Sequence, residues 1–238
     1  MLYPRALSIL EDIDKLIEEI SSTGKSISGK LLIGASTIPG AYILPKLAAS
    51  FKTRYPDISF ELRISDSTKI VQSIKNNELF IGIVGAEIAS KGLNYIPLAA
   101  DELILVAAKD NPVPGKITFD NLCGLPFIMR ETGSGTKRSI ESLLEQQQFS
   151  ANRLNICATL GSSSAVKEAT KADLGVSIIS RCGVQDELAM GRLKEIQVEN
   201  LTMQRAFFFV TSTKRTLPRI YAEFLKQTLD EVSSPHNR

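Results

Sequence analysis

Residues 31–56 place a short apolar run directly before a polar turn and an amphipathic helix, and this order limits the possible folds more than any other feature. The run at 31–33 is bounded by Gly34, which is typical of a buried parallel strand. Apolar side chains then recur with the helical period at Leu44, Leu47, Ala48 and Phe51. Pro56 ends the helix, because the residue before a proline is disfavoured in the helical region. The stretch predicts a strand–turn–helix corner.

The turn of this corner carries the hydroxyls of Ser36 and Thr37. Backbone N–H groups at a helix start, beside such hydroxyls, suit a small anion or carboxylate. Alternatively, the two hydroxyls only cap the helix. Similar polar corners recur along the chain, at 66–68, 132–136 and 161–164, which favours the binding interpretation.

The order of predicted elements indicates two α/β units. Apolar runs and alternation predict strands at 58–64, 80–85, 93–100, 103–108, 126–130, 154–160, 175–180, 193–198 and 205–210. Helices are expected at 66–77, from 136 to the polar run at 145–148, from 164 onward, and at 184–190 and 217–232. The charged pair at 101–102 is expected to interrupt the chain between the two series. Two lobes with facing corners follow, because open α/β sheets bind ligands at the carboxyl ends of their strands.

Residues 2–20 predict a helix of a different kind. Its apolar side chains follow a 4-3-4-3-4 spacing, at Leu2, Ala6, Ile9, Ile13, Leu16 and Ile20. So short a helix is marginal alone in water, so it should pack either on a partner chain or on the body of its own domain. The polar segment 21–26 reads as a flexible connector to a globular unit that begins near Ile27.

Composition excludes several classes of protein. The 238 residues are 43% apolar and 23% charged, with a formal net charge of +2, which is ordinary for a globular protein and argues against a nucleic-acid-binding surface. No apolar segment is long enough to span a membrane, and no secretory leader is visible. Cys123, Cys157 and Cys182 are widely spaced, which favours buried thiols in a reducing compartment over a disulfide framework or a zinc site.

No enzyme signature emerges. The glycine-rich segment 133–136 is neither a dinucleotide fingerprint, because Arg138 stands where the third glycine belongs, nor a Walker loop. The segment 161–164 fails as a nucleophile elbow, since Ala165 replaces the last glycine. The sole histidine, His236, lies in the polar tail, which argues against histidine-based catalysis and metal sites. We expect no enzyme, no cofactor and no metal.

Together these pieces resemble the effector-binding domain of LysR-type transcriptional regulators. The matching segments are 29–36, 97–98, 101–106 and 126–136. Single positions match as well: 44, 45, 47, 51, 55 and 56 in the first helical region, Pro112, and 161, 162 and 165–167 near the later corner. The helix at 2–20 resembles the lower part of the family's dimerising linker helix. The resemblance covers essentially the whole chain.

The resemblance implies a fold similar to type 2 periplasmic binding proteins, with two Rossmann-like lobes of mixed, mostly parallel sheets joined by crossover strands. Residues 1–25 would form a linker helix and connector, residues 26–102 with 213–238 lobe I, and residues 103–212 lobe II. It further implies a cytoplasmic homo-oligomer, a dimer or tetramer, whose DNA-binding domain would lie before Met1. A solute-binding protein of a transport system and an enzyme on the same scaffold are the alternatives.

Carried over by position, the resemblance also implies the residues that contact the effector, a small oxyanion or organic acid. The first lobe would contribute Ser36, Thr37, Ser67, Gly85 and Ala86, and the second lobe Thr132, Gly133, Ser134, Ser162 and Ser163. Arg130 is the one basic candidate near them.

Two positions depart from the family pattern. Phe80 replaces a usual acidic residue and makes that end of its strand more apolar. Asp173 replaces a usual glycine, and Asp tolerates a left-handed backbone better than most residues.

Overall fold

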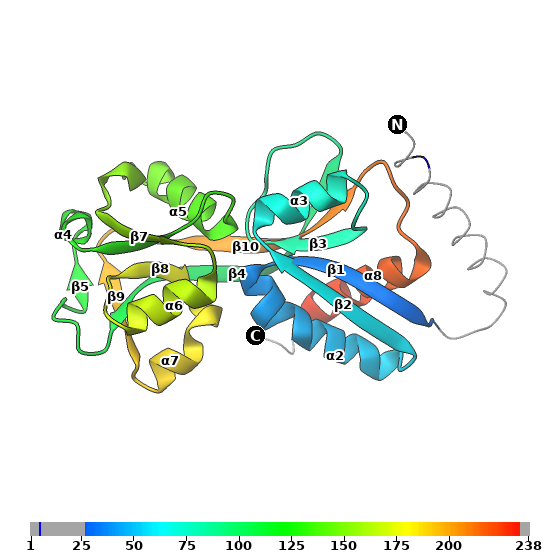
Figure 1. Ribbon diagram of the computed structural model, residues 1–238, viewed down its shortest axis with the longest axis horizontal. Helices are drawn as coiled ribbons and strands as arrows, with labels where there is room; N and C mark the ends of the chain where they lie inside the picture. The colour runs from blue at the N-terminus through cyan, green and yellow to red at the C-terminus, as the bar shows by residue number, and fades with distance from the viewer. Residues whose placement is uncertain (1–4, 6–26, 234–238) are drawn as a thin grey trace.

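The computed structural model describes Arg5 and residues 27–233, which form two α/β lobes side by side (Figure 1). The long strand β4 (Leu93–Ala108) runs through both lobes, and β10 (Gln204–Ser212) pairs antiparallel with its first part, so that the two strands connect the lobes. Except for Arg5, the helix predicted at 2–20 lies outside the described residues.

The first lobe is a five-stranded sheet in the order β2-β1-β3-β10-β4, in which β1, β2 and β3 are parallel. Its other strands are β1 (Gly29–Ser36), β2 (Ile58–Ser65) and β3 (Ile81–Val84). Because strand side chains alternate, one face packs against α2 (Leu44–Arg54) and α8 (Arg219–Ser233), and the other against α3 (Ser67–Lys75). A π-helix, η1 (Pro39–Ile43), joins β1 to α2.

The second lobe is built on the last part of β4. This part pairs with β8 (Ser177–Ser180) and β9 (Leu193–Val198), while β5 (Lys116–Ile117) extends β9. The parallel pair β6 (Phe127–Arg130) and β7 (Ile156–Leu160) joins through a bridge from Phe127 to Val176.

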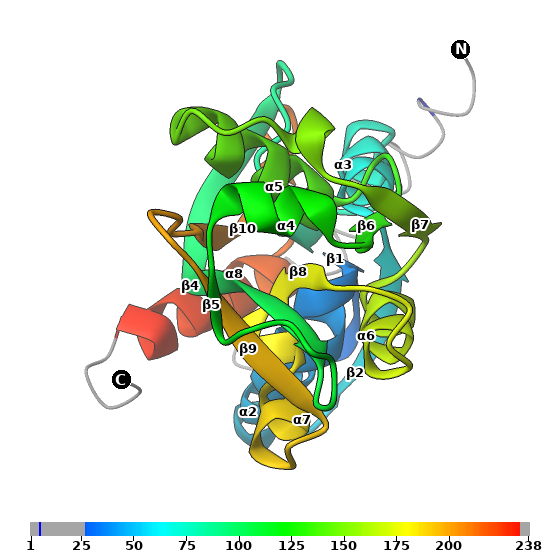
Figure 2. The ribbon, with the colours of Figure 1, turned by 90° about the vertical axis from the view of Figure 1, so that its left-hand side faces the viewer.

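Helices cover both faces of these second-lobe strands. One face carries α4 (Phe119–Gly124) and α5 (Gly135–Gln146), and the other α6 (Ser163–Lys171) and α7 (Gln185–Ala189), as Figure 2 shows end-on. Two 3-10 turns complete the lobe, η2 (Ala151–Arg153) and η3 (Arg181–Gly183).

The interruption predicted at 101–102 is wrong. β4 continues through both residues, because Asp101 is buried and forms an ion pair with Arg205 of β10, with 2.7 Å between Oδ2 and Nε. The two partners face each other in the β4–β10 register, although 104 residues separate them in sequence. A charged residue therefore stays inside the strand that connects the lobes.

The first-lobe core is aromatic and includes part of β10. Phe51 and Phe209 contact Phe224 of α8 edge-on, and Phe207 packs in the same cluster. The sequence had assigned residues 207–212 to lobe II, yet Phe207, Phe209 and the buried Val210 pack in first-lobe clusters. We propose that the lobes divide near residue 204.

Several local expectations can be compared with the structure. Asp173 does adopt a left-handed backbone, with φ of 60°, and it accepts a hydrogen bond from Asn111. Phe80 contacts the Tyr221 ring at a tilt and lies under the Arg215 guanidinium, on the side of β3 away from the corners. Cys157 is exposed rather than buried, because β7 is an edge strand, and Cys123 and Cys182 are only partly buried.

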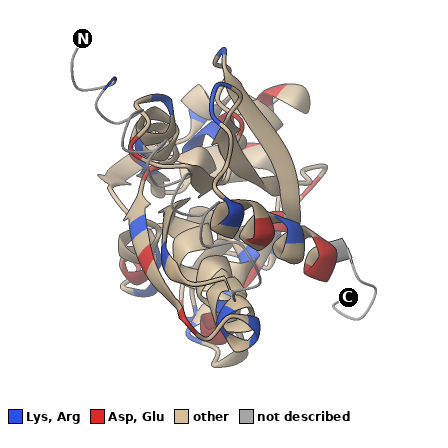
Figure 3. Ribbon diagram, turned by 90° about the vertical axis from the view of Figure 1, so that its right-hand side faces the viewer, with Lys and Arg blue, Asp and Glu red and all other residues tan. Residues whose placement is uncertain are grey.

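Residues of both charges are interspersed along the ribbon. Lys and Arg alternate with Asp and Glu over the first lobe (Figure 3), in keeping with the net charge of +2. Within the described residues, no helix is long and apolar enough to cross a membrane.

Candidate functional site

The polar corners of the two lobes face each other across one cleft. The corner after β1 comes first, and the start of α3 and the end of β3 lie beside it in lobe I. Lobe II supplies the starts of α5 and α6. Asp66, Ser134 and Ser162 cap α3, α5 and α6 by accepting backbone hydrogen bonds.

Capping does not explain the first corner. Ile38 and Ile43 precede η1 and α2, and neither helix has a side-chain cap. Thr37 instead reaches across to the second lobe, where its Oγ1 lies 2.8 Å from the Ser163 hydroxyl. The alternative that Ser36 and Thr37 only cap a helix is therefore not observed.

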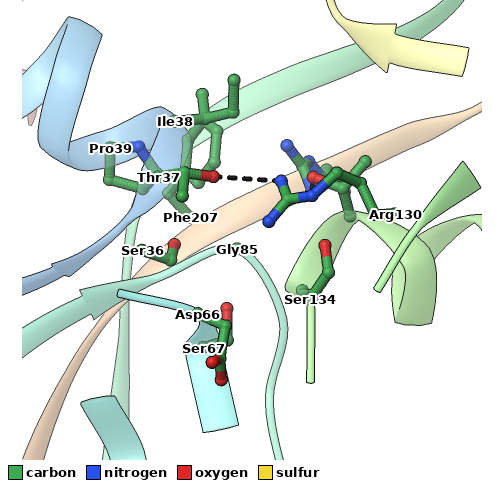
Figure 4. A pocket seen from close by; sticks show the side chains of 13 residues that line it. Ser36, Thr37, Ile38, Pro39, Asp66, Ser67, Gly85, Arg130, Ser134 and Phe207 are labelled. Atoms are coloured by element: carbon green, nitrogen blue, oxygen red, sulfur yellow. Dashed lines mark hydrogen bonds between the residues drawn. The ribbon is translucent and has the colours of Figure 1, made fainter. Parts of the chain in front are cut away.

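Between the corners lies a small, largely buried cavity (Figure 4). Its volume of about 10 Å³ is near the minimum needed to hold one water molecule. Five of the ten predicted site residues line it: Ser36, Thr37, Ser67, Gly85 and Ser134. Two arginines line it as well, Arg130 and Arg205.

Arg130 closes one side of this cavity. Its Nε and Nη2 donate to the two carboxylate oxygens of Glu131, both at 2.7 Å. Its Nη1 donates to Thr37 Oγ1 of the other lobe at 3.1 Å and to Ser163 Oγ at 2.6 Å (Figure 4 shows the bond to Thr37). The guanidinium is thus neutralised within its own lobe while it links the two lobes.

Arg205 was not predicted as a site residue. Its guanidinium bonds to Asp101 through Nε and to Thr136 Oγ1 through Nη1, and it lies 4.9 Å from the centre of the Phe207 ring. Burial lowers the pKa of Arg205, and the Asp101 carboxylate opposes that shift. The sequence offered one signal, a basic residue at the start of the most apolar predicted strand, but its partner Asp101 is distant along the chain.

Direct hydrogen bonds hold the corners together. The backbone N–H and the hydroxyl of Thr68 both donate to the Gly133 carbonyl, and Ser139 Oγ donates to the Gly85 carbonyl. Gly133 has φ of 102°, a conformation that favours glycine. At Gly135 the lobes approach so closely that a Cβ atom would lie 2.5 Å from Ser67 Oγ.

The other predicted residues lie around this cavity. Thr132, Gly133 and Ser162 line an adjoining open pocket of about 700 Å³, which shares Thr37 and Asp66 with the cavity. Burial raises the pKa of the Asp66 carboxyl, but hydrogen bonds from Lys69 outweigh burial and lower it overall. Ser163 touches Arg130 and Thr37, while Ala86 lies beside Gly135 without lining the cavity.

A second polar contact joins the lobes between η1 and α6. Lys167 Nζ donates to the Tyr42 hydroxyl at 3.2 Å and pairs with Glu187 at 2.8 Å. Burial raises the pKa of Glu187, but the hydrogen bond and charge of Lys167, with smaller contributions, together lower it overall. Burial lowers the pKa of Lys167, but its hydrogen bonds to Glu187 and Tyr42 and the charge of Glu187 together raise it overall. This charge is again neutralised inside lobe II.

The geometry offers donors and hydroxyls for an anion and no metal site. Among the described residues, no group of three His, Cys, Asp or Glu side chains could hold a metal ion. What the two lobes build together is a small polar cleft with buried guanidinium groups.

Residues 24–233 match the sequence profile of a family described as the LysR substrate binding domain. The chain belongs to the LysR substrate-binding domain family. The resemblance drawn from the sequence is thereby confirmed.

A curated relative agrees with this assignment. The HTH-type transcriptional regulator YeiE of Escherichia coli K12, described as uncharacterized, is 31% identical over 226 residues, which cover 94% of this chain and 75% of that protein. The chain is therefore related to transcriptional regulators over almost its whole length.

Solved structures of LysR-type regulatory domains have the same fold. The CcmR regulatory domain of Synechocystis PCC6803, in complex with 2-PG, superposes with a TM-score of 0.78 at 26% identity, covering 87% of this chain and 99% of that one. The effector-binding domain of QuiR, in complex with shikimate, gives 0.76 at 19% identity, covering 86% and 97%. The predicted α/β fold, similar to type 2 periplasmic binding proteins, is confirmed.

Proposed function

We propose that this LysR substrate-binding domain senses a small anionic effector in the cleft between its two lobes. The observation that carries the proposal is the cavity itself, because lobe I, lobe II and the crossover strand β10 all contribute polar groups to it. We further propose that the protein acts in the cytoplasm as a homo-oligomer, that it is not an enzyme, and that it reaches DNA through a separate DNA-binding domain.

The chemistry of the cleft supports an anion in particular. Two buried guanidinium groups and the buried hydroxyls of Ser36, Ser67 and Ser134 surround the cavity. Charge-assisted hydrogen bonds to an oxyanion are about twice as strong as neutral ones. The CcmR domain was solved with 2-PG (2-phosphoglycolate) and that of QuiR with shikimate, two small anionic molecules. A compact oxyanion or organic acid fits this setting.

Binding would act on the relative position of the lobes. The present arrangement is closed by the protein's own contacts, such as those of Thr37 with Arg130 and Ser163. An effector larger than one water has to separate these groups and replace their contacts with its own. A coupling of about 1–3 kcal/mol between the two arrangements is typical of such ligand-driven changes.

A melting screen tests the ligand class. Sulfate, phosphate, acetate, 2-phosphoglycolate and shikimate would be added at one constant ionic strength, with glycerol as the neutral control. A true effector at 100 times its Kd adds about 2.7 kcal/mol to the free energy of unfolding and raises Tm accordingly. If glycerol raises Tm as much as the anions do, or if no anion raises it, the proposed ligand class is wrong.

The molecular mass in solution separates a regulator from a transport protein. The heptad-like spacing at 2–20 leads us to expect a dimer whose association weakens when Ile9, Ile13 and Leu16 are replaced by Ser. Light scattering on the full chain and on this variant measures the change. A monomeric full chain would favour the solute-binding alternative.

A further inference from the structure

The two guanidinium groups of the cleft differ in how many of their nitrogens are already engaged. In Arg130 all three nitrogens donate: Nε and Nη2 to Glu131, and Nη1 to Thr37 and Ser163. An anion approaching Arg130 would have to displace a carboxylate or two hydroxyls. Arg130 is therefore occupied as a link between the lobes.

Arg205 is engaged on one side only. Its Nε donates to Asp101 and its Nη1 to Thr136, whereas its Nη2 is buried and has no hydrogen-bond partner among the described residues. The side chain is 5% exposed, so water does not compensate fully for the missing partner. Buried donors of charged groups are rarely left unpaired, which points to a partner from outside the chain.

A second unpaired group lines the same cavity. Ser67 Oγ is fully buried and likewise has no partner in the described part of the chain. The backbone leaves room for both groups at two glycines: a Cβ atom on Gly85 would lie 3.1 Å from Arg205 Nη1, and one on Gly135 would lie 2.5 Å from Ser67 Oγ. The cavity is thus lined by a cationic residue and a serine that each carry a polar atom without a hydrogen-bond partner in the part of the chain that the structure describes.

We propose that Arg205, and not Arg130, anchors the anionic group of the effector, with Nη2 donating to an anionic oxygen and Ser67 Oγ as the second donor. This inference rests on the proposed function, since it assigns a residue to the ligand class named there. The shared chemistry is an anionic oxygen, which a planar carboxylate or a tetrahedral phosphate or sulfate can supply.

The place of Arg205 in the fold gives this contact a consequence. Arg205 pairs with Asp101 where β10 and β4 cross between the lobes, and Asp101 Oδ1 accepts a hydrogen bond from Ser180 Oγ of β8. An anion on Nη2 competes with the Asp101 carboxylate for the same positive charge. Binding therefore bears directly on the strands that connect the lobes.

Paired substitutions test the anchor without leaving a buried charge unpaired. The full chain would be titrated by calorimetry with sulfate, phosphate, acetate and 2-phosphoglycolate at constant ionic strength. For each anion that the wild type binds, Arg205→Gln combined with Asp101→Asn should lower the affinity by about 30-fold or more, because the charge-assisted hydrogen bond is lost. Arg181→Gln combined with Glu195→Gln removes an exposed ion pair outside the cavity and should leave affinity within about twofold.

A single substitution should change the anion affinity in the opposite direction. Asp101→Asn keeps an oxygen that can accept from Arg205 Nε but removes the competing negative charge, so anions should bind about 3- to 10-fold more tightly. A purely structural role of Arg205 would not produce tighter binding. This measurement also stands alone if the double variant fails to fold, which circular dichroism would reveal.

The outcomes separate the two proposals. If Arg130→Gln combined with Glu131→Gln abolishes anion binding while the Arg205 pair variant retains it, or if Asp101→Asn weakens binding, Arg205 is not the anchor. If the wild type binds anions and the Arg205 pair variant binds them equally well, the anchor assignment fails and the proposed function stands. If the wild type binds no anion, the proposed ligand class fails, and the assignment of Arg205 fails with it.

Discussion

The two lobes bring different chemistry to the interface between them. Lobe II contributes the charged side chains Arg130 and Lys167, and each is neutralised within that lobe, by Glu131 and Glu187 respectively. Lobe I contributes hydroxyls such as that of Thr37, and its own guanidinium at the cleft, Arg205, is paired with Asp101 and donates to the uncharged Thr136 of lobe II. These three cations at the cleft therefore contact the opposite lobe through uncharged groups, and closing the lobes there forms hydrogen bonds without pairing new charges.

This difference explains how the interface can open. A hydrogen bond contributes about 0.5–1.5 kcal/mol net. A few such bonds therefore favour the closed arrangement by a free energy that the binding of a small effector can offset. Had each lobe carried one member of every ion pair, opening would separate buried charges at a far higher cost. Because each of these charged side chains is paired within its own lobe, its charge stays compensated in both the closed and the opened arrangement.

The largest expected effect comes from removing that compensation in lobe II. Glu131→Gln leaves Arg130, which is 4% exposed, without its carboxylate, and we expect the free energy of unfolding to fall by about 2–4 kcal/mol. Urea unfolding at pH 7 measures the loss. Glu102→Gln is the matched control, because Arg181 is more exposed and retains Glu195; its loss should stay below about 1 kcal/mol. Equal losses would show that burial of the charge does not matter here.

The next effect concerns contact between the lobes rather than stability. Gly135→Ala places a Cβ atom 2.5 Å from Ser67 Oγ and should force the lobes apart. Alanine at the first position of α5 partly offsets this, since it favours a helix by about 1 kcal/mol relative to glycine. We expect a larger radius of gyration in X-ray scattering and a free energy of unfolding within about 1 kcal/mol of the wild type.

Gly124→Ala is the matched control for this change. Gly124 is the last residue of α4, and a Cβ atom there meets nothing within 4 Å. The radius of gyration should not change. An unaltered radius in Gly135→Ala as well would mean that the buried serine gives way and that the lobes remain closed.

Much of the fold could be predicted because its signals are local. The corner at 31–56 follows from hydrophobic period and turn residues, and the structure places a strand, a π-helical turn and a helix there. The helix α4 was missed although Thr118 and Asn121 form a reciprocal capping box, which the sequence does show. The break predicted at Asp101 failed for a different reason, namely that its partner is 104 residues away.

The residues of the candidate site show the same difference between local signals and contacts distant in sequence. Ser36, Thr37, Ser67 and Ser134 could be proposed from the sequence because each follows a strand or starts a helix, and the structure brings them around one cavity. Arg205 could not, since only the pairing of β10 with β4 places it beneath the corners. Residues in polar corners are thus visible in sequence, whereas a charged group in a crossover strand requires the topology.

A smaller effect tests the hydroxyls that lobe I supplies. Thr37→Val keeps the side-chain volume but removes the oxygen that accepts from Arg130 and contacts Ser163, so the free energy of unfolding should fall by about 1 kcal/mol. Tyr42→Phe removes only the acceptor of Lys167, which retains Glu187, and should cost about 0.5 kcal/mol. Urea unfolding of both variants measures the ranking. A larger loss for Tyr42→Phe would mean that the contact between η1 and α6, not the cleft, dominates closure.

The smallest effect is the pH dependence of the Lys167–Glu187 pair. The pKa of Glu187 is lowered, so its contribution is complete above the unfolded value of about 4.3 and disappears as the pH falls through the folded value. The pKa of Lys167 is raised, so its contribution is complete below about 10.4 and disappears as the pH rises through the folded value. The stabilisation by the pair should therefore be constant from about pH 5 to pH 9.

Lys167→Met combined with Glu187→Gln removes both charges together. The difference in unfolding free energy from the wild type should be below about 1 kcal/mol and flat between pH 5 and 9. It should be smaller at pH 3.5, because there the unfolded chain binds a proton at Glu187 more readily than the folded protein does. Urea unfolding at pH 3.5, 5, 7 and 9 gives the four values. A difference that changes between pH 5 and 9 would require another titrating group to join the pair. The charge of Lys167 would then not be neutralised within lobe II alone, and the contrast between a charged, self-compensated lobe and a hydroxyl-bearing lobe would not hold at this contact.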